Sequence, residues 1–209
     1  MKVHSMTTEP SKLKHFGAIQ TAYRAFEFRS RLEAKWAMFF DLCGWNWGYE
    51  PTERHGYIPD FVLGYRPSLV EVKPFHRIEQ WDEAIQKIIQ SGINEPVILL
   101  GDDPTWISVS LTIAGDMAPA IGWLAEPLDI DGQRDFAITR LHFGFTEGNQ
   151  KLGLCPLDSN WVNLIQQPPE NCQWKHKWSR VEMERSDLEK QLVERWANAG
   201  NAAKWVPTK

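Results

Sequence analysis

Two stretches of sequence, YIPDFVLG at residues 57–64 and LVEVK at residues 69–73, decide the fold of this chain. Both are rich in β-branched and aromatic residues, and the turn residues RPS at 66–68 separate them, which predicts a β-hairpin. Pro59 stands near the start of the first strand, where its missing N–H is tolerated, and Pro74 ends the second. We therefore expect two antiparallel neighbours in a sheet.

Charged and apolar side chains alternate on the second of these strands. Side chains two residues apart on a strand share a face, so Glu71 and Lys73 point the same way and Val72 points to the other. Asp60 opens the first strand, and across a hairpin it can face Glu71 at one end of the pair. The hairpin thus predicts two carboxylates and one lysine close together.

The segments around the hairpin predict further helices and strands. Apolar residues recur every three or four positions in 25–43 and in 78–90, which indicates two amphipathic helices. Residues 45–50 are typical of a strand, and the continuous apolar run 96–100 (PVILL) suits a buried central strand. A meander followed by a helix and another strand predicts an α/β fold, with a mixed central sheet flanked by helices.

A single carboxylate interrupts the apolar stripe of the first expected helix. Glu33 stands four residues from Ala37 and seven from both Phe26 and Phe40, so its side chain lies on the stripe or at its edge. A lone buried carboxylate is costly, so Glu33 must be protonated, paired or bound to a metal ion.

These three carboxylates and the lysine supply the parts of a metal-dependent phosphodiesterase site. Mg²⁺ prefers a few carboxylate oxygens, with water and substrate oxygens completing its shell. Bound in this way, it lowers the pKa of a water ligand and neutralises charge on a phosphate under attack. Lys73 can orient that water, help to deprotonate it, or screen the developing negative charge. The plainer alternative is a solvated Glu71–Lys73 pair beside a common Pro59–Asp60 turn.

The chain resembles the PD-(D/E)xK nuclease superfamily over residues 26–103. The resemblance rests on FRSRLEAKWAMFF (28–40), YEP (49–51), YIPDFVL (57–63) and LVEVKPF (69–75), with PVILLGD (96–102) after the second helix. It is most similar to small nucleases of phages and mobile elements, and to endonuclease subunits of cut-and-paste transposons. The resemblance implies a restriction-endonuclease-like core that hydrolyses DNA with Mg²⁺ or Mn²⁺.

The resemblance also implies a role for each site residue. Asp60 and Glu71 are the metal-binding carboxylates, Lys73 is the catalytic lysine, and Glu33 is the first-helix glutamate that joins them at the metal. We expect the backbone carbonyl of Val72 to complete the metal site. Members often carry a glutamine or lysine on the next helix, and the candidates for that position, including its contacts with DNA, are Gln80, Gln86 and Lys87.

Cations gather in two other places, although the net charge of −4 does not by itself indicate a nucleic-acid-binding protein. Arg29 and Arg31 flank Glu33 and are placed to contact phosphates. Lys175 and Lys177 lie among tryptophans, which suits either a DNA-binding surface or a protein interface, including that of a homodimer. The alternative in each place is an ordinary solvated surface.

We expect a flexible N-terminal arm at 1–18, the nuclease core at 19–104, and a small C-terminal extension at 105–209 that is first β-rich and then helical at 180–199. The resemblance does not cover the extension. A zinc site built from Cys155, Cys172 and His176, with His142 as a possible fourth ligand, is a weaker hypothesis, because the spacing lacks a C-x₂-C pair.

Bulk composition sets the remaining limits. Three cysteines among 209 residues argue against a disulfide framework and for a reducing cytoplasm. Apolar runs stay shorter than 18 residues, so we expect no membrane span. The sequence therefore predicts a metal-dependent DNA endonuclease. Its rival is a nucleic-acid-binding or assembly subunit that keeps the nuclease fold without cutting.

Overall fold

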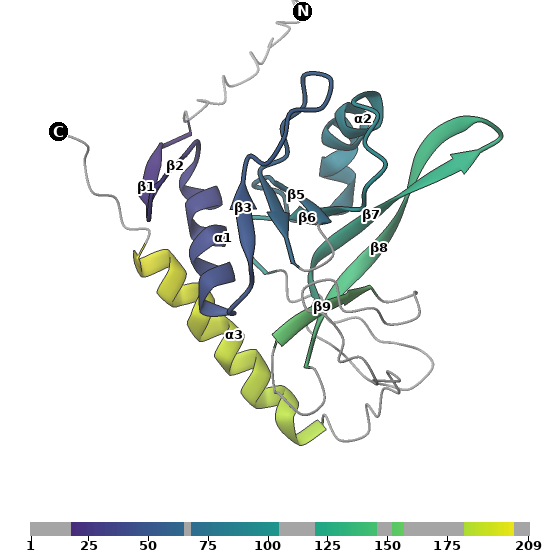
Figure 1. Cartoon of the computed structure of the whole chain (residues 1–209). Coiled ribbons are helices and arrows are strands. Elements are labelled where there is room, and N and C mark those ends of the chain that lie inside the picture. The colour runs from purple at the N-terminus through teal and green to yellow at the C-terminus, as the bar shows by residue number, and fades with distance from the viewer. Residues whose placement is uncertain (1–17, 65–67, 105–119, 146–151, 157–181, 203–209) are drawn as a thin grey trace, which may run out of the picture.

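Seven strands form one mixed sheet in the order β3-β4-β5-β6-β7-β8-β9 (Figure 1). Within this sheet β5 and β6 are parallel, and the other neighbours pair antiparallel. The strands are β3 (Trp47–Tyr49), β4 (Phe61–Leu63), β5 (Ser68–Val72), β6 (Val97–Leu100), β7 (Ala120–Ile130), β8 (Gln133–Phe145) and β9 (Leu152–Pro156). The computed structural model describes residues 18–64, 68–104, 120–145, 152–156 and 182–202.

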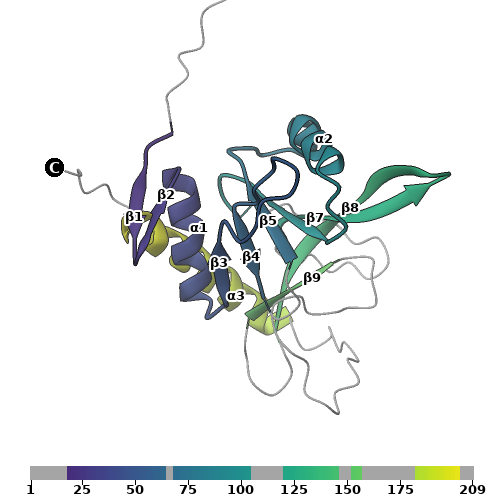
Figure 2. The same ribbon diagram turned by 45° about the horizontal axis from the view of Figure 1, so that its top comes forward.

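Helices cover both faces of this sheet, which makes the fold a mixed α/β one. Helices α1 (Arg31–Leu42) and α3 (Glu182–Ala202) lie on one side, and α2 (Asp82–Gln90) lies on the other (Figures 1 and 2). Strand β6 is fully buried, and its side chains alternate between the two hydrophobic clusters. Ile98 and Leu100 join the cluster of α1, whereas Val97 and Leu99 join the cluster of α2. This confirms the expected buried central strand.

The first helix begins later than the sequence pattern predicted, so the expected start at residue 25 is wrong. Residues before it form a two-stranded hairpin of β1 (Thr21–Tyr23) and β2 (Phe26–Phe28). Ser30 then caps α1, because its Oγ accepts a hydrogen bond from the Glu33 backbone N–H at 3.1 Å. The aromatic residues of β2 suit a strand, and the cap fixes where helical geometry starts.

The central hairpin pairs as expected, with Phe61 of β4 opposite Val70 of β5. The first strand is shorter than predicted, because Asp60 lies just before β4 instead of within it. Tyr57 forms only an isolated bridge with Arg54, and the turn beside it contains Gly56 at a φ of +81°. A turn this tight, followed by a proline, prevents regular pairing before Phe61. The second expected helix begins as a 3₁₀ turn (Ile78–Trp81) and continues as α2.

The chain after residue 104 continues the same sheet. Strands β7 and β8 form a long hairpin that projects beyond the helices (Figure 2). Asp131 and Gly132 at its turn have φ values of +54° and +80°, as the Asp-Gly pair of a tight hairpin turn requires. Because β7 pairs with β6, strands β3 to β6 before residue 104 and β7 to β9 after it belong to one sheet.

Helix α3 confirms the expected C-terminal helix and packs along α1. The Trp196 ring lies 4.6 Å from that of Trp36, and Leu192 is fully buried. The apolar pattern of residues 180–199 would also place Val193 in this packing face, but Val193 is half exposed, so that assignment is wrong. Among the described helices, none has both the length and the apolar composition that crossing a bilayer requires.

Candidate functional site

Two buried carboxylates meet at the ammonium group of Lys73. Lys73 Nζ donates to a carboxylate oxygen of Glu71 and lies 3.9 Å from Asp60 Oδ2. It also lies 3.2 Å from the backbone carbonyl oxygen of Val72. Asp60 is 1% exposed and Glu71 is 5% exposed. The structure therefore brings together the two carboxylates, the lysine and the carbonyl that the sequence analysis combined.

Strand geometry produces this convergence. Glu71 and Lys73 share one face of the β5 segment, while Val70 and Val72 pack into the cluster around α1 on the other. Asp60, at the edge of the neighbouring strand, accepts a hydrogen bond from the Val72 backbone N–H at 2.7 Å. That bond continues the pairing of β4 and β5 through a side chain, and it fixes the carboxylate at the end of the hairpin.

The surroundings of Asp60 disfavour its charge. Burial, and then the neighbouring Glu71 carboxylate, raise the pKa of Asp60 to about 7. The ammonium of Lys73 and the N–H of Val72 oppose this shift without cancelling it. The pKa of Asp60 therefore lies close to neutral pH. A bound cation would lower it and favour the charged carboxylate.

Lys73 is held in its charged form. Burial alone would lower the pKa of Lys73, but the carboxylates of Glu71 and Asp60 outweigh burial and raise it. A protonated lysine donates hydrogen bonds and stabilises negative charge, but it does not take up a proton. Of the roles open to Lys73, this favours the stabilisation of charge.

Arg29 is the second cation of the site. Its Nη2 donates to Asp60 Oδ1, and its Nε lies 2.9 Å from Glu50 Oε1 and 3.9 Å from Glu33 Oε2. Burial alone would lower the pKa of the guanidinium, but Asp60 and the other carboxylates outweigh it and raise that pKa. The structure places Arg29 among three carboxylates, and its expected contact with DNA stays a prediction.

Glu33 is buried and fully paired, which is one of the three states expected for it. Its Oε1 accepts from Ser30 Oγ at 2.8 Å. Its Oε2 accepts from Tyr49 OH at 2.7 Å and from the Arg29 backbone N–H at 3.2 Å. Glu33 thus accepts hydrogen bonds from the cap residue Ser30 and from the backbone before it at the start of α1, and it reaches the other carboxylates through Arg29. The expectation that Phe26 shares its helix is wrong, because Phe26 lies in β2.

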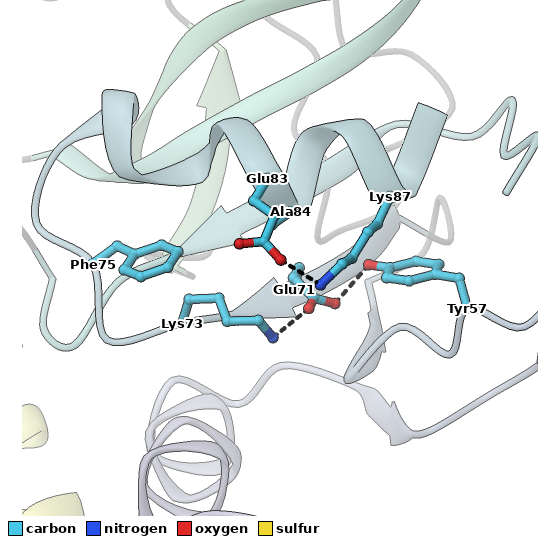
Figure 3. Close-up of a pocket in the computed structure, with 7 residues that line it drawn as sticks. All are labelled: Tyr57, Glu71, Lys73, Phe75, Glu83, Ala84 and Lys87. Atoms are coloured by element: carbon cyan, nitrogen blue, oxygen red, sulfur yellow. Dashed lines mark hydrogen bonds and ion pairs between the residues drawn. The ribbon is translucent and has the colours of Figure 1, made fainter. Parts of the chain in front are cut away.

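A small pocket opens beside Glu71 and Lys73 (Figure 3). It has a volume of about 140 Å³ and is lined by Tyr57, Glu71, Lys73, Phe75, Glu83, Ala84 and Lys87. Tyr57 OH donates to Glu71 Oε2 at 2.6 Å, and Lys87 Nζ donates to Glu83 Oε1 at 2.8 Å. Helix α2 thus supplies a cation at the rim of the pocket, above the β5 residues.

The remaining residues expected to contact DNA or to bind zinc lie in different places. Gln86 and Arg31 are exposed. Gln80 is a structural residue, since its Oε1 accepts the backbone N–H groups of His76 and Arg77 and caps the 3₁₀ turn. Lys175, Lys177, Cys172 and His176 lie outside the described residues. Cys155 lies in β9, where its backbone is opposite that of His142. The zinc site and the C-terminal DNA contacts therefore stay predictions.

No protein-family model, curated protein or solved structure matches this chain.

Sequence reasoning missed the residues that hold the site carboxylates in place. Tyr49, Tyr57 and Glu50 contact Glu33, Glu71 and Arg29, respectively. Tyr49 and Glu50 stand in the YEP stretch already quoted for the resemblance, so their closeness to the motif was the available signal. Tyr57 begins the YIPDFVL stretch, but nothing in the sequence pairs it with Glu71.

A second group of possible ligands lies where β5 and β6 end at the same edge of the sheet. His76 Nδ1 lies 2.9 Å from Asp102 Oδ1, and Asp103 completes a set whose ligand atoms are mutually within 4.8 Å. The signal for this group was the parallel pairing of β5 with β6, because the residues that follow parallel strands meet at one edge.

The oxygen atoms around Lys73 fit a hard divalent cation. Asp60, Glu71 and the Val72 carbonyl offer only oxygen atoms, which Mg²⁺ and Mn²⁺ prefer. Water and substrate oxygens must supply the remaining ligands, as is usual for Mg²⁺. In this structure Lys73 and Arg29 contact these oxygens, so a metal ion must compete with the two cationic side chains for them.

Proposed function

We propose that this chain is a metal-dependent DNA endonuclease of the PD-(D/E)xK type, with Mg²⁺ or Mn²⁺ as its cofactor. One observation carries the proposal: two buried carboxylates, a backbone carbonyl and a protonated lysine converge at the end of one hairpin. Ordinary surface charge pairs are solvated, whereas Asp60 and Glu71 are almost fully buried. Burying two acids side by side costs folding free energy, and such arrangements are concentrated at functional sites.

The order of elements supports a restriction-endonuclease-like core. A helix precedes the meander β3-β4-β5, and a second helix crosses from β5 to the parallel strand β6. The proposed ligands stand at the end of the meander, beside the crossover helix. The sequence resemblance covers this same part of the chain.

The proposed roles follow from the contacts. Asp60, Glu71 and the Val72 carbonyl would hold the cation, which supplies an acidified water and neutralises charge on the phosphate. Lys73, kept protonated by its neighbours, would stabilise the negative charge that develops on the phosphate. Glu33 would act by holding Arg29 and the start of α1 in position.

DNA is the proposed substrate. Its proposed contacts are Lys87, which lines the pocket, and the exposed residues Arg31 and Gln86. Lys175 and Lys177 would extend the surface or contact a protein partner such as a second copy of the chain. The sparse cysteines suit action in the cytoplasm.

A cleavage assay tests this function. The purified protein is incubated with Mg²⁺ or Mn²⁺ and with single-stranded, duplex or branched DNA. We expect cleavage of at least one form, its loss on chelation, and its loss in Asp60→Ala. Glu79→Gln is the matched control, because Glu79 is an exposed acid on the neighbouring 3₁₀ turn. DNA binding without cleavage under every condition would favour the non-cleaving subunit, and cleavage by Asp60→Ala would refute the assigned site.

A further inference from the structure

We infer that Arg29 is a displaceable latch on Asp60: a divalent cation drives its guanidinium off the carboxylate, and the freed guanidinium then binds a substrate phosphate. This inference rests on the proposed function, because it concerns how the same site takes up its metal. It assigns to Arg29 a coupling role that links metal binding to phosphate binding.

The first step of the argument is that protein donors occupy both oxygens of Asp60. Oδ2 accepts the Val72 backbone N–H at 2.7 Å, and Oδ1 accepts from Arg29 Nη2. The side chain of Asp60 is 1% exposed. A cation that binds Asp60 must therefore compete with these donors, and most strongly with the positively charged guanidinium at Oδ1.

The second step is that Arg29 is the donor able to move. The Val72 N–H belongs to β5, which is paired on both sides within the sheet, so its position is fixed. Arg29 lies in the short connection between β2 and α1, and its side chain is 51% exposed. Its backbone N–H is held by Glu33 Oε2 and by Tyr49 OH at 3.0 Å. The side chain can thus swing while its backbone stays in place.

The third step concerns where the guanidinium goes. Glu50, whose side chain is 35% exposed, already accepts from Arg29 Nε at 2.9 Å. When a cation takes Asp60, it neutralises that carboxylate and repels the guanidinium, while the contact with Glu50 remains available. Arg29 would then stand at the edge of the site with its Nη groups free. A planar guanidinium with two free donors suits bidentate binding of a phosphate.

A consequence is that metal and phosphate should favour each other's binding. Each ligand requires Arg29 to leave Asp60, so the ligand that binds first has already supplied that free energy. Coupling between two sites is reciprocal, so phosphate must strengthen metal binding by the same factor.

Calorimetry with Mn²⁺ tests the latch in the full chain. Arg29→Gln removes the competing cation, so Mn²⁺ should bind more tightly, on the order of tenfold, as expected for the loss of a charged hydrogen bond. Arg31→Gln is the matched control. It removes the same charge two residues away, from an exposed side chain for which the described residues offer no ion pair. The control should change the affinity by less than about twofold, because exposed charges are screened.

Nuclear magnetic resonance gives a second readout. In the chelator-treated protein, the Arg29 Nε–H should give a protected signal, assigned by its loss in Arg29→Gln. Mn²⁺ is paramagnetic, so this titration uses Mg²⁺, and the signal should shift as Asp60 is occupied. An unchanged signal at saturating Mg²⁺ would overturn the latch.

The outcomes separate the two proposals. Equal gains in Arg29→Gln and Arg31→Gln, or weaker binding in Arg29→Gln, would overturn the latch while leaving an Asp60-dependent nuclease in place. If neither the natural chain nor Arg29→Gln binds Mn²⁺, or if Asp60→Ala binds it equally well, the proposed metal site itself is refuted.

Discussion

Replacing Asp60 by asparagine should remove a pH dependence from the stability of the chelator-treated protein. The folded protein raises the pKa of Asp60 from 3.8 to about 7, mainly through burial and then through Glu71. Asparagine keeps an oxygen that can accept the Val72 N–H but has no proton to gain or lose. The comparison therefore removes the ionisation of Asp60 together with its coupling to Glu71.

The sign and the size follow from linkage. Between about pH 4 and pH 7 the folded protein binds the Asp60 proton more tightly than the unfolded chain does, so the free energy of unfolding falls as the pH rises. The stabilising contribution is fully present below the unfolded pKa and is lost once the pH passes the folded pKa. A shift of about three units at about 1.4 kcal/mol per unit gives a loss on the order of 4 kcal/mol.

Urea unfolding followed by tryptophan fluorescence measures this difference, and the eleven tryptophans of the chain give a strong signal. Other groups also titrate, so the measured quantity is the stability of Asp60→Asn minus that of the natural chain at each pH. This difference should grow in favour of the variant from about pH 4 to about pH 8. Glu79→Gln, the exposed control, should show a flat difference. Parallel curves for Asp60→Asn and the natural chain would refute the reasoning.

Two further predictions concern the other site residues. Lys73→Met should reduce cleavage by at least about a hundredfold. It should leave the Mn²⁺ affinity measured by calorimetry largely intact, because a protonated lysine donates hydrogen bonds and cannot bind a metal ion. Lost affinity with retained cleavage would reverse the assigned roles. Glu33→Gln should lower the free energy of unfolding by about 1 kcal/mol, as should Ser30→Ala, because each weakens the hydrogen bonds at the start of α1. Greater stability in Glu33→Gln would show an unpaired buried charge instead.

The sequence predicted most of the central hairpin, and the reason is local. Period-two alternation in LVEVK fixes which side chains share a face, and the turn between the strands fixes their pairing. The run PVILL likewise carries its own signal, because a strand buried on both faces needs apolar residues at every position. These features depend on neighbours in sequence, so a pattern along the chain reveals them.

The partners of Glu33 were not identified from the sequence, although a signal for one of them was present. Ser30 and Glu33 form the S-x-x-E pattern of a capping box, which marks a helix start. Reading the apolar periodicity alone extended the helix back to Phe26 and left the carboxylate apparently without a partner. The cap supplies that partner, and Tyr49 from a distant strand supplies another. Only the first of these was readable from the sequence.

The role of the segment after residue 104 had no local signal. Strand β7 pairs with β6 across a long separation in sequence, and this pairing joins the extension to the central sheet. Hydrophobic patterns show that a strand exists, but they do not show which edge it joins. Similarly, no pattern indicates that Arg29 reaches Asp60, because the two residues are brought together by α1, β3 and β4 packing as a unit.

The cations paired with Asp60 and Glu71 differ in how freely they can move. Each buried carboxylate has its own cation: Asp60 has Arg29, and Glu71 has Lys73. This pairing keeps two adjacent acids tolerable inside the protein, yet it also opposes the entry of a metal ion. Lys73 directly follows β5, and its backbone N–H donates to the Leu100 carbonyl at 3.0 Å, which holds it beside Glu71. Arg29 is attached through a loop and has Glu50 as a second partner, so it can leave without being stranded. The site thus has one fixed cation suited to the reacting phosphate and one movable cation suited to giving way.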